Sequence, residues 1–370
     1  MSGFTPPPYP YDRLAPIAER AAAHEGGIVD CSIGTPCDPP PDEVVEALAA
    51  SGTERGYPTS AGSEVLRSAA LGWIARRFDV ELPDTALAAC VGTKELVAST
   101  AQMLHLRQPD KDVVLYPAIS YPTYAMSATL AGLEAVPVRL EEGRLDLDSI
   151  EPSIRQRALL LWSNSPSNPT GHLDDLAVAA AWGRSHGVPV FSDECYAEFT
   201  WADRPRSILE EGPGGVVAVH SLSKRSNLAG LRAGFYAGDH ELVSFLRSVR
   251  QHAGLMVPGP VQAAAAVALD DDAHVEVQRR RYADRLGLVI AGLRAAGYDA
   301  IAPAGTFYIW LPVPDRLEDG WALAQELADS AGLLVSPGEL YGADGSRFVR
   351  IAVVQTDERL ALAMERLNGN

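Results

Sequence analysis

Two hydroxyls, a lysine and an arginine follow a short apolar run in the middle of the sequence. The run Val216–His220 leads into Ser221, Ser223 and Lys224, and Arg232 comes eight residues after the lysine. Continuous apolar runs are typical of strands in a mainly parallel sheet, and open α/β sheets bind ligands at the carboxyl ends of their strands. A lone lysine there would be read as a surface charge. With hydroxyls before it and an arginine after it, the pattern predicts a phosphate site beside a reactive amine.

A second candidate is the carboxylate of Asp193, which follows the apolar run Val188–Phe191. A carboxylate at the end of a buried strand is poorly solvated unless it meets a cation. Asp193 could therefore face a protonated ring nitrogen, with Tyr196 donating a hydrogen bond to the same ring. The alternative, a turn or helix-cap aspartate, stays open at this point.

Two further groups could hold oxygen atoms of a ligand. Asn168 lies in the turn-forming run NSPSNPTG, and its amide could bind a cofactor oxygen. Gly92, Thr93 and Lys94 open an expected helix, whose first backbone amides form an anion site. Many helices begin in this way, so this last signal is weak by itself.

The elements that must position these residues alternate along the chain. Strand-like runs lie at 112–116, 135–140, 158–162, 188–192, 216–220 and 233–237, and helical stretches at 94–106, 121–133, 173–186 and 241–252. This alternation predicts an α/β fold with right-handed crossovers. After an Arg-rich helix at about 276–296, the runs 306–312, 323–331 and 347–354 read as strand, helix, strand. We expect a large domain over 42–275 and a smaller α+β domain.

Composition excludes several classes of protein. The 370 residues are 47% hydrophobic and 21% charged, with a formal net charge of −17, so neither a largely disordered chain nor a nucleic-acid partner is expected. The four cysteines show no metal-site or disulfide pattern, and no metal is expected. The N-terminal residues do not resemble a signal peptide, and no apolar run has membrane-spanning length. The sequence predicts a cytoplasmic protein without membrane contact.

Taken together and in order, these motifs resemble the class I/II pyridoxal-phosphate aminotransferases of fold type I. The resemblance rests on NPTG, SDECY, SLSK with an arginine eight residues on, and a late FVRI, and it covers nearly the whole chain. It implies a large domain with a mainly parallel seven-stranded sheet, and a small domain built from residues 1–41 and 276–370. It also implies bound pyridoxal 5'-phosphate and a homodimer whose active sites are shared between subunits.

Site roles follow from the resemblance position by position. Lys224 corresponds to the lysine that forms the internal aldimine, Asp193 pairs with the pyridinium nitrogen, and Tyr196 and Asn168 bond the phenolic oxygen. The remaining matches are Tyr121 as the aromatic stacked on the ring, Gly92, Thr93, Lys94, Ser221, Ser223 and Arg232 around the phosphate, Tyr57 reaching the neighbouring subunit's phosphate, and Arg350 with the backbone of Gly34 on the substrate α-carboxylate.

The substrate is less constrained than the cofactor. The sequences of four segments are similar to those of actinobacterial N-succinyldiaminopimelate aminotransferase: VGTKEL, SDECY, HSLSK and HAGLMVP. This resemblance implies that glutamate donates the amino group and N-succinyl-2-amino-6-oxopimelate accepts it, in lysine and diaminopimelate biosynthesis. Distal carboxylates need a further cation, and Arg250 and His252 are the available donors. Neither falls at the family position, and Arg250 could equally end a helix, where a cation suits the dipole.

Other functions remain alternatives on the same residues. An aspartate or LL-diaminopimelate aminotransferase, or a cysteine-conjugate β-lyase, would use the same cofactor residues. The spacing Ser221-x-x-Lys224 also fits the nucleophile motif of penicillin-binding proteins, but the SDN and KTG motifs that accompany it are missing. A non-catalytic regulator on this fold would need a basic DNA-binding region, and the sequence offers none.

Overall fold

The computed structural model describes residues 4–369, which form two compact units. The large unit comprises residues 35–281 and 303–306, and the small unit comprises residues 4–34, 282–302 and 307–369. The sequence-based division after residues 41 and 275 stays a prediction.

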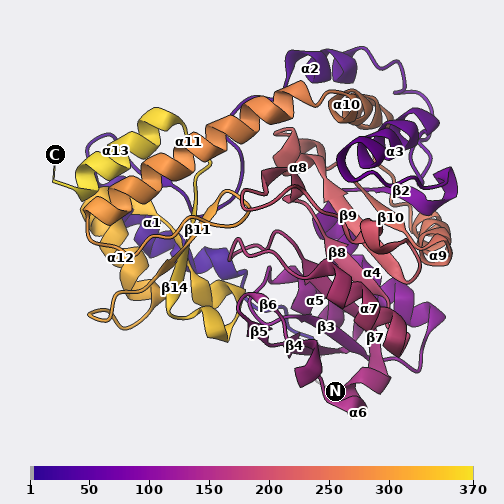
Figure 1. Ribbon diagram of the computed structural model, residues 1–370. Helices are drawn as coiled ribbons and strands as arrows, with labels where there is room; N and C mark the ends of the chain where they lie inside the picture. The colour runs from indigo at the N-terminus through magenta and orange to yellow at the C-terminus, as the bar shows by residue number, and fades with distance from the viewer. Residues whose placement is uncertain (1–3, 370) are drawn as a thin grey trace. The chain divides into compact units, whose positions relative to one another are not determined.

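A seven-stranded sheet forms the centre of the large unit (Figure 1). Its strands, in spatial order, are β2 (Leu87–Cys90), β10 (Gly234–Gly238), β9 (Val216–Ser221), β8 (Val190–Asp193), β7 (Ala158–Asn164), β3 (Val113–Pro117) and β4 (Glu134–Val138). Strand β10 runs antiparallel to both neighbours, and the other pairs are parallel. The expected α/β fold with a mainly parallel seven-stranded sheet is therefore confirmed.

Two apolar cores lie on opposite faces of this sheet, because successive side chains of a strand point to opposite sides. Leu87 and Ala89 of β2 belong to one core, and Ala88 and Cys90 belong to the other. The first core is covered by α3 (Glu64–Phe78), α7 (Leu176–His186) and α10 (Gly259–Asp270). The second is covered by α4 (Thr93–Arg107), α5 (Thr123–Ala131) and α9 (His240–His252).

Shorter elements complete the large unit. They are α2 (Asp42–Ala49), α6 (Pro152–Arg157), α8 (Leu222–Arg225) and the hairpin of β5 (Leu140–Glu141) and β6 (Arg144–Leu145). Helix α8 is a single turn that begins directly after β9, so the end of that strand and the turn form one continuous segment.

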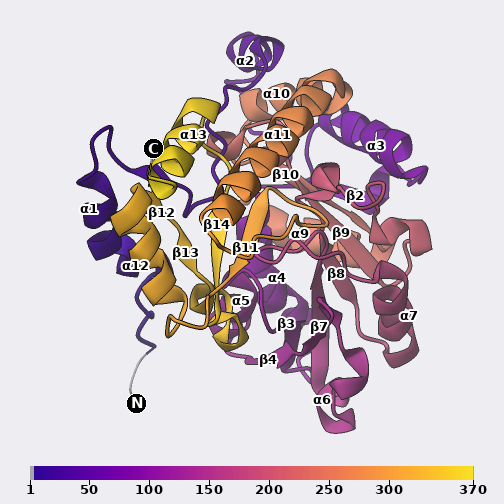
Figure 2. The same ribbon diagram turned by 60° about the vertical axis from the view of Figure 1, so that its left-hand side comes forward.

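The small unit has its own three-stranded antiparallel sheet, which Figure 2 shows beside its helices. The strands are β11 (Tyr308–Pro312), β14 (Phe348–Ala352) and β13 (Ser336–Pro337), and the helices are α1 (Ala15–Ala22), α12 (Gly320–Ala331), α13 (Asp357–Leu367) and most of α11 (Ala273–Ala295). The predicted strand, helix and strand after residue 300 correspond to β11, α12 and β14. Strand β1 (Val29–Asp30) pairs in parallel with β12 (Leu333–Leu334). None of the helices described is long and apolar enough to cross a membrane.

Candidate active site

Asp193 is the last residue of β8, and two neighbours hold its carboxylate. The phenol of Tyr124 donates to Oδ2 at 2.8 Å, and the backbone amide of Cys195 donates to Oδ1 at 3.2 Å. Burial raises the pKa of Asp193, while these two hydrogen bonds oppose the rise. The side chain is thus held in one orientation at the edge of the sheet, as a residue that must meet a cationic ring nitrogen requires.

Asn164 fixes the turn that carries Asn168. Its Nδ2 donates to the carbonyl of Asp193 at 2.8 Å, and its Oδ1 accepts from the backbone amide of Asn168 at 2.8 Å. The strand register places Asn164 opposite Asp193. The predicted residue Asn168 is therefore tied, through Asn164, to the strand end that bears Asp193. The sequence motif contained Asn164, but its type alone did not indicate this role.

Gly92 and Arg232 approach each other so closely that a side chain at position 92 would displace the guanidinium of Arg232. A Cβ on Gly92 would lie 2.2 Å from Nη2 of Arg232, and Gly92 has a φ of 74°. Arg232 itself has a left-handed backbone and donates to the carbonyl of Ala229 at 3.0 Å. Gly92 is the N-cap of α4 and no side chain caps that helix, so the guanidinium and the positive end of the helix dipole lie together. This is the chemistry of an anion site.

The strand register brings the hydroxyl-bearing segment to the same edge. Gly234 of β10 lies opposite Cys90 of β2 on one side and Ser221 of β9 on the other. Cys90 precedes the start of α4 by only a few residues, and Ser221 caps α8 by accepting from the backbone amide of Ser223 at 3.1 Å. Lys224 lies one residue further on in this turn.

Two side-chain contacts extend the cluster around the start of α4. The thiol of Cys195 lies 3.4 Å from Oγ1 of Thr93, which links the Asp193 segment to this helix. The ammonium of Lys94 lies 5.6 Å from the ring centroid of Tyr121. Tyr196, the next residue after Cys195 in the sequence, is buried. The other predicted cofactor residues of the large unit therefore gather at one edge of the sheet. No such contact is described for Tyr57, whose side chain is fully exposed.

The predicted carboxylate-binding residues Arg350 and Gly34 belong to the small unit. Arg350 is buried on β14, donates through Nη2 to the carbonyl of Ser32 at 2.5 Å, and has its guanidinium carbon 4.2 Å from the ring centroid of Tyr308. A Cβ on Gly34 would lie 2.1 Å from the hydroxyl of the same tyrosine. The arginine, the glycine and the Ser32 carbonyl thus form one packed group.

Arg250 is placed differently from what the substrate hypothesis required. Its Nη1 and Nη2 donate to the two carboxylate oxygens of Glu95 at 2.9 and 2.6 Å, and its side chain is 1% exposed. A guanidinium engaged in this way inside the protein has its charge neutralised by Glu95. The geometry favours the structural role that the sequence had left open. His252, at the end of the same helix, is exposed.

A buried pair that sequence reasoning did not single out lies beside the site residues. Nε2 of His220 is 3.4 Å from Oε2 of Glu194, and both side chains are buried. Burial raises the pKa of Glu194 to about 8 and lowers that of His220 to about 3. Both side chains are therefore neutral near pH 7. Glu194 directly follows the site residue Asp193, and His220 directly precedes Ser221. This adjacency is the only feature of the sequence that could have indicated the pair.

Comparison with known proteins identifies the family. The model of the protein family described as "Aminotransferase class I and II" matches residues 27–367. The chain belongs to this family. It is 44% identical over 369 residues to the 4-dedimethylamino-4-oxo-anhydrotetracycline transaminase OxyQ of Streptomyces rimosus, covering 98% of this chain and 99% of that one. It is also 32% identical over 378 residues to an LL-diaminopimelate aminotransferase of Gloeobacter violaceus, covering 98% and 96%.

Solved structures agree with this family. A probable N-succinyldiaminopimelate aminotransferase from Thermus thermophilus superimposes with a TM-score of 0.88 at 28% identity, covering 97% of this chain and 99% of that one. The protein is accordingly a pyridoxal-phosphate-dependent aminotransferase that acts on amino and keto acids. The cradle of Gly92 and Arg232 and the oriented carboxylate of Asp193 fit the phosphate and the ring nitrogen of that cofactor.

Proposed function

We propose that this aminotransferase moves an amino group between glutamate and N-succinyl-2-amino-6-oxopimelate, in diaminopimelate and lysine biosynthesis, and that Lys224 is its catalytic lysine. The position of Lys224 in the fold supports its assignment as the catalytic lysine. It lies in a one-turn helix at the carboxyl end of β9, at the sheet edge that also holds Asp193 and Arg232. The similarity to the Thermus thermophilus protein supports the choice of substrate.

Pyridoxal phosphate, when bound, supplies an electron sink for the negative charge that develops at the substrate's Cα. The chain's own residues prepare that chemistry. Asp193, fixed by Tyr124 and the Cys195 amide, would keep the ring nitrogen protonated. The start of α4 and Arg232 would bind the phosphate. The amine of Lys224 would hold the proton that leaves the substrate's Cα, acting first as a general base and then as a general acid.

Arg350 is proposed to bind the α-carboxylate of the substrate. A guanidinium offers a planar pair of donors that matches a carboxylate, which a lysine could not reproduce. Nη2 of Arg350 already donates to Ser32, which restricts the rotation of the guanidinium before any substrate arrives. The backbone at Gly34 would assist in binding this carboxylate. A larger residue would not fit at position 34, because the tyrosine next to it occupies the space.

A half-reaction screen tests the proposed substrates. The absorbance of the bound cofactor is followed while glutamate, N-succinyl-LL-diaminopimelate, LL-diaminopimelate, aspartate and aromatic or branched amino acids are added one at a time. Conversion by glutamate and by the succinylated substrate supports the proposal, and conversion by aromatic or branched amino acids alone would overturn it. A β-lyase would release pyruvate and ammonia from a cysteine conjugate, so both products are measured in parallel.

A second candidate follows from the 44% identity to OxyQ, whose name describes the transamination of a 4-oxo-anhydrotetracycline. The physiological amino acceptor would then be a polycyclic ketone instead of a keto acid. The amine form of the enzyme, prepared with glutamate, distinguishes the two candidates. Re-oxidation by the succinylated keto acid favours the first, and re-oxidation by a polycyclic ketone alone favours the second.

We also propose that the enzyme is a cytoplasmic homodimer. Tyr57 supports the dimer, because a tyrosine that is 100% exposed in one chain is available to reach the phosphate bound by the partner subunit. Tyr57→Phe is then expected to weaken cofactor binding without changing the oligomeric state, as measured by equilibrium dialysis and light scattering.

A further inference from the structure

Two segments of the large unit carry proposed cofactor residues, and a buried ion pair joins them. Asp193 and Tyr196 lie on one segment, which continues to Glu198. Lys224 lies on the other, immediately before Arg225. Nε of Arg225 is 3.2 Å from Oε1 of Glu198, and the two side chains are only 4% and 5% exposed.

Glu198 receives donors from three directions. The indole Nε1 of Trp73 donates to Oε1 at 2.9 Å, Arg77 donates to Oε2, and Arg225 donates to Oε1. Arg279 also binds the backbone carbonyl of Glu198. A carboxylate with this many donors keeps one position, because moving it would leave the buried cations around it unpaired.

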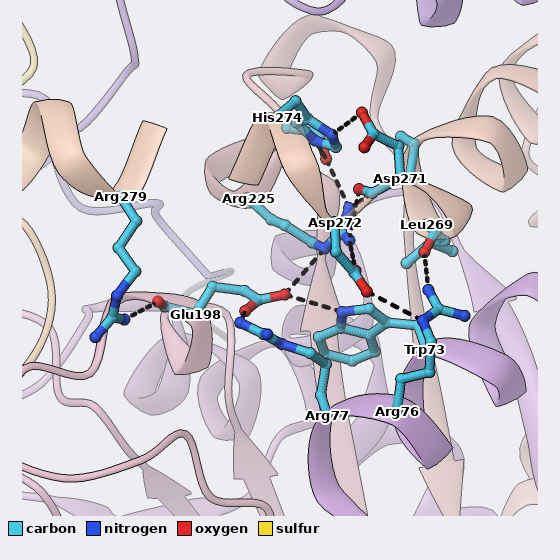
Figure 3. A network of polar contacts seen from close by, with 12 residues as sticks. Trp73, Arg76, Arg77, Glu198, Arg225, Leu269, Asp271, Asp272, His274 and Arg279 are labelled. Carbon is cyan, nitrogen blue, oxygen red and sulfur yellow. Dashed lines mark hydrogen bonds and ion pairs between the residues drawn. The ribbon is translucent and has the colours of Figure 1, made fainter. Parts of the chain in front are cut away.

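Arg225 uses all three of its nitrogens on different partners, as Figure 3 shows. Nη1 donates to the carbonyl of Ala268 and to Oγ of Ser226 at 3.1 Å, and Nη2 donates to Oδ1 of Asp272 at 3.1 Å. The guanidinium carbon lies 5.7 Å from the ring centroid of Trp73. The residue next to Lys224 is therefore anchored to α10, to the loop before α11 and to the Glu198 segment together.

A one-turn helix cannot hold its own shape, since nucleating a helix costs more than one turn recovers. Helix α8 has only four residues, with Ser221 as its cap. Something outside the turn must hold it, and the side chain of Arg225 reaches out of the turn to three separate segments.

We propose that Arg225 and Glu198 are positioning residues, which set the orientation of the Lys224 turn relative to the segment of Asp193 and Tyr196. Neither residue is assigned to the cofactor or the substrate. Their role is to keep the amine and the ring-binding carboxylate in one geometry while the proton moves. This inference rests on the proposed role of Lys224.

The experiment compares cofactor-loaded wild type with Glu198→Gln, Arg225→Lys and Trp73→Phe. Trp73→Phe removes one donor to Glu198 and changes no charge, so it separates positioning from electrostatics. Arg76→Gln is the matched control. Arg76 belongs to the same network through Asp272 and the carbonyl of Leu269, and its bonds do not involve Glu198 or Arg225.

Three quantities are measured for each protein: thermal unfolding, the pH midpoint of the cofactor absorbance, and the rate of the half-reaction with glutamate. We expect the three test variants to move the midpoint by about half a pH unit or more and to slow the half-reaction about tenfold or more, the order of effect that a misplaced catalytic group produces. Arg225→Lys should not rescue, because one ammonium cannot reproduce three diverging donors. Arg76→Gln should keep both values.

Two outcomes overturn the reasoning at different points. If the folded test variants lose thermal stability but keep the wild-type midpoint and rate, the network is purely structural and the inference is wrong. If an Arg225 or Glu198 variant does not fold, Trp73→Phe alone decides by the same criterion. Borohydride reduction and peptide mapping of wild type come first. A label on a lysine other than Lys224 overturns the proposed function itself, and the inference with it.

Discussion

Replacing Arg250 by methionine tests whether this arginine serves the fold or the substrate. Methionine fills a similar volume but cannot donate to Glu95, so the two hydrogen bonds at 2.9 and 2.6 Å are lost. Removing one partner of a buried ion pair costs about 3–5 kcal/mol when the other charge stays buried. Glu95 keeps 24% of its side chain exposed and still accepts from Ser99 at 3.0 Å, so we expect a smaller loss, about 2–3 kcal/mol.

The expected loss converts into a measurable shift of the unfolding temperature. Unfolding entropy is about 2.1 cal/mol/K per residue, which for the roughly 250 residues of the large unit gives about 2 °C per kcal/mol. The variant should therefore unfold about 4–6 °C below wild type. Arg247→Met is the control, because Arg247 lies on the same helix and its bond to the carbonyl of Thr85 is long, at 3.4 Å.

The same variant discriminates between the two roles by its substrate dependence. If Arg250 serves the fold, the half-reactions with glutamate and with alanine slow by the same factor. Alanine is the informative comparison because it lacks the distal carboxylate. A selective loss with glutamate, together with an unchanged unfolding temperature, would refute the structural reasoning and return Arg250 to the substrate site.

Three further results are expected. Lys224→Ala should stay folded with no turnover, and peptide mapping after borohydride reduction should find no labelled lysine, whereas residual turnover would move the catalytic role elsewhere. Asp193→Ala should keep the cofactor and lose most of the half-reaction rate, and near-normal rates would make Asp193 a turn residue only. Glu194→Gln should gain stability over wild type as the pH rises from about 4.5 to 8. The folded protein favours neutral Glu194, whose pKa is raised to about 8, so wild type loses stability across that window, while the amide does not titrate. Urea unfolding at pH 5 and pH 8 measures this, and an equal difference at both values would contradict it.

The sheet was predictable from sequence where its strands are apolar and long enough. The runs around β3, β7, β8, β9 and β10 were found because they are continuous and buried on both faces. Strand β2, with the sequence LAAC, was missed, since two alanines in four residues carry no strand preference. Its place beside the antiparallel strand β10 is decided by pairing partners that lie far away in the sequence.

The site could be predicted as residue types but not as contacts. Residues at the ends of strands, such as Asp193 and Ser221, were found because parallel strands bring their carboxyl ends to one edge. Tyr124 was not singled out as a partner of Asp193, which is 69 positions away. Glu95 lies 155 positions from Arg250, so no local pattern could show that this cation was already paired.

The pairing of β1 with β12 also constrains the order in which the chain can fold during synthesis. Val29 and Asp30 leave the ribosome about 300 residues ahead of Leu333 and Leu334, their partners in the sheet. At about 5–20 residues per second, this interval lasts roughly 15–60 s. All seven strands of the large unit are made within that time, so the large unit can fold while the N-terminal strand waits unpaired. A chain whose synthesis stops before residue 333 would contain strand β1 but not its partner β12.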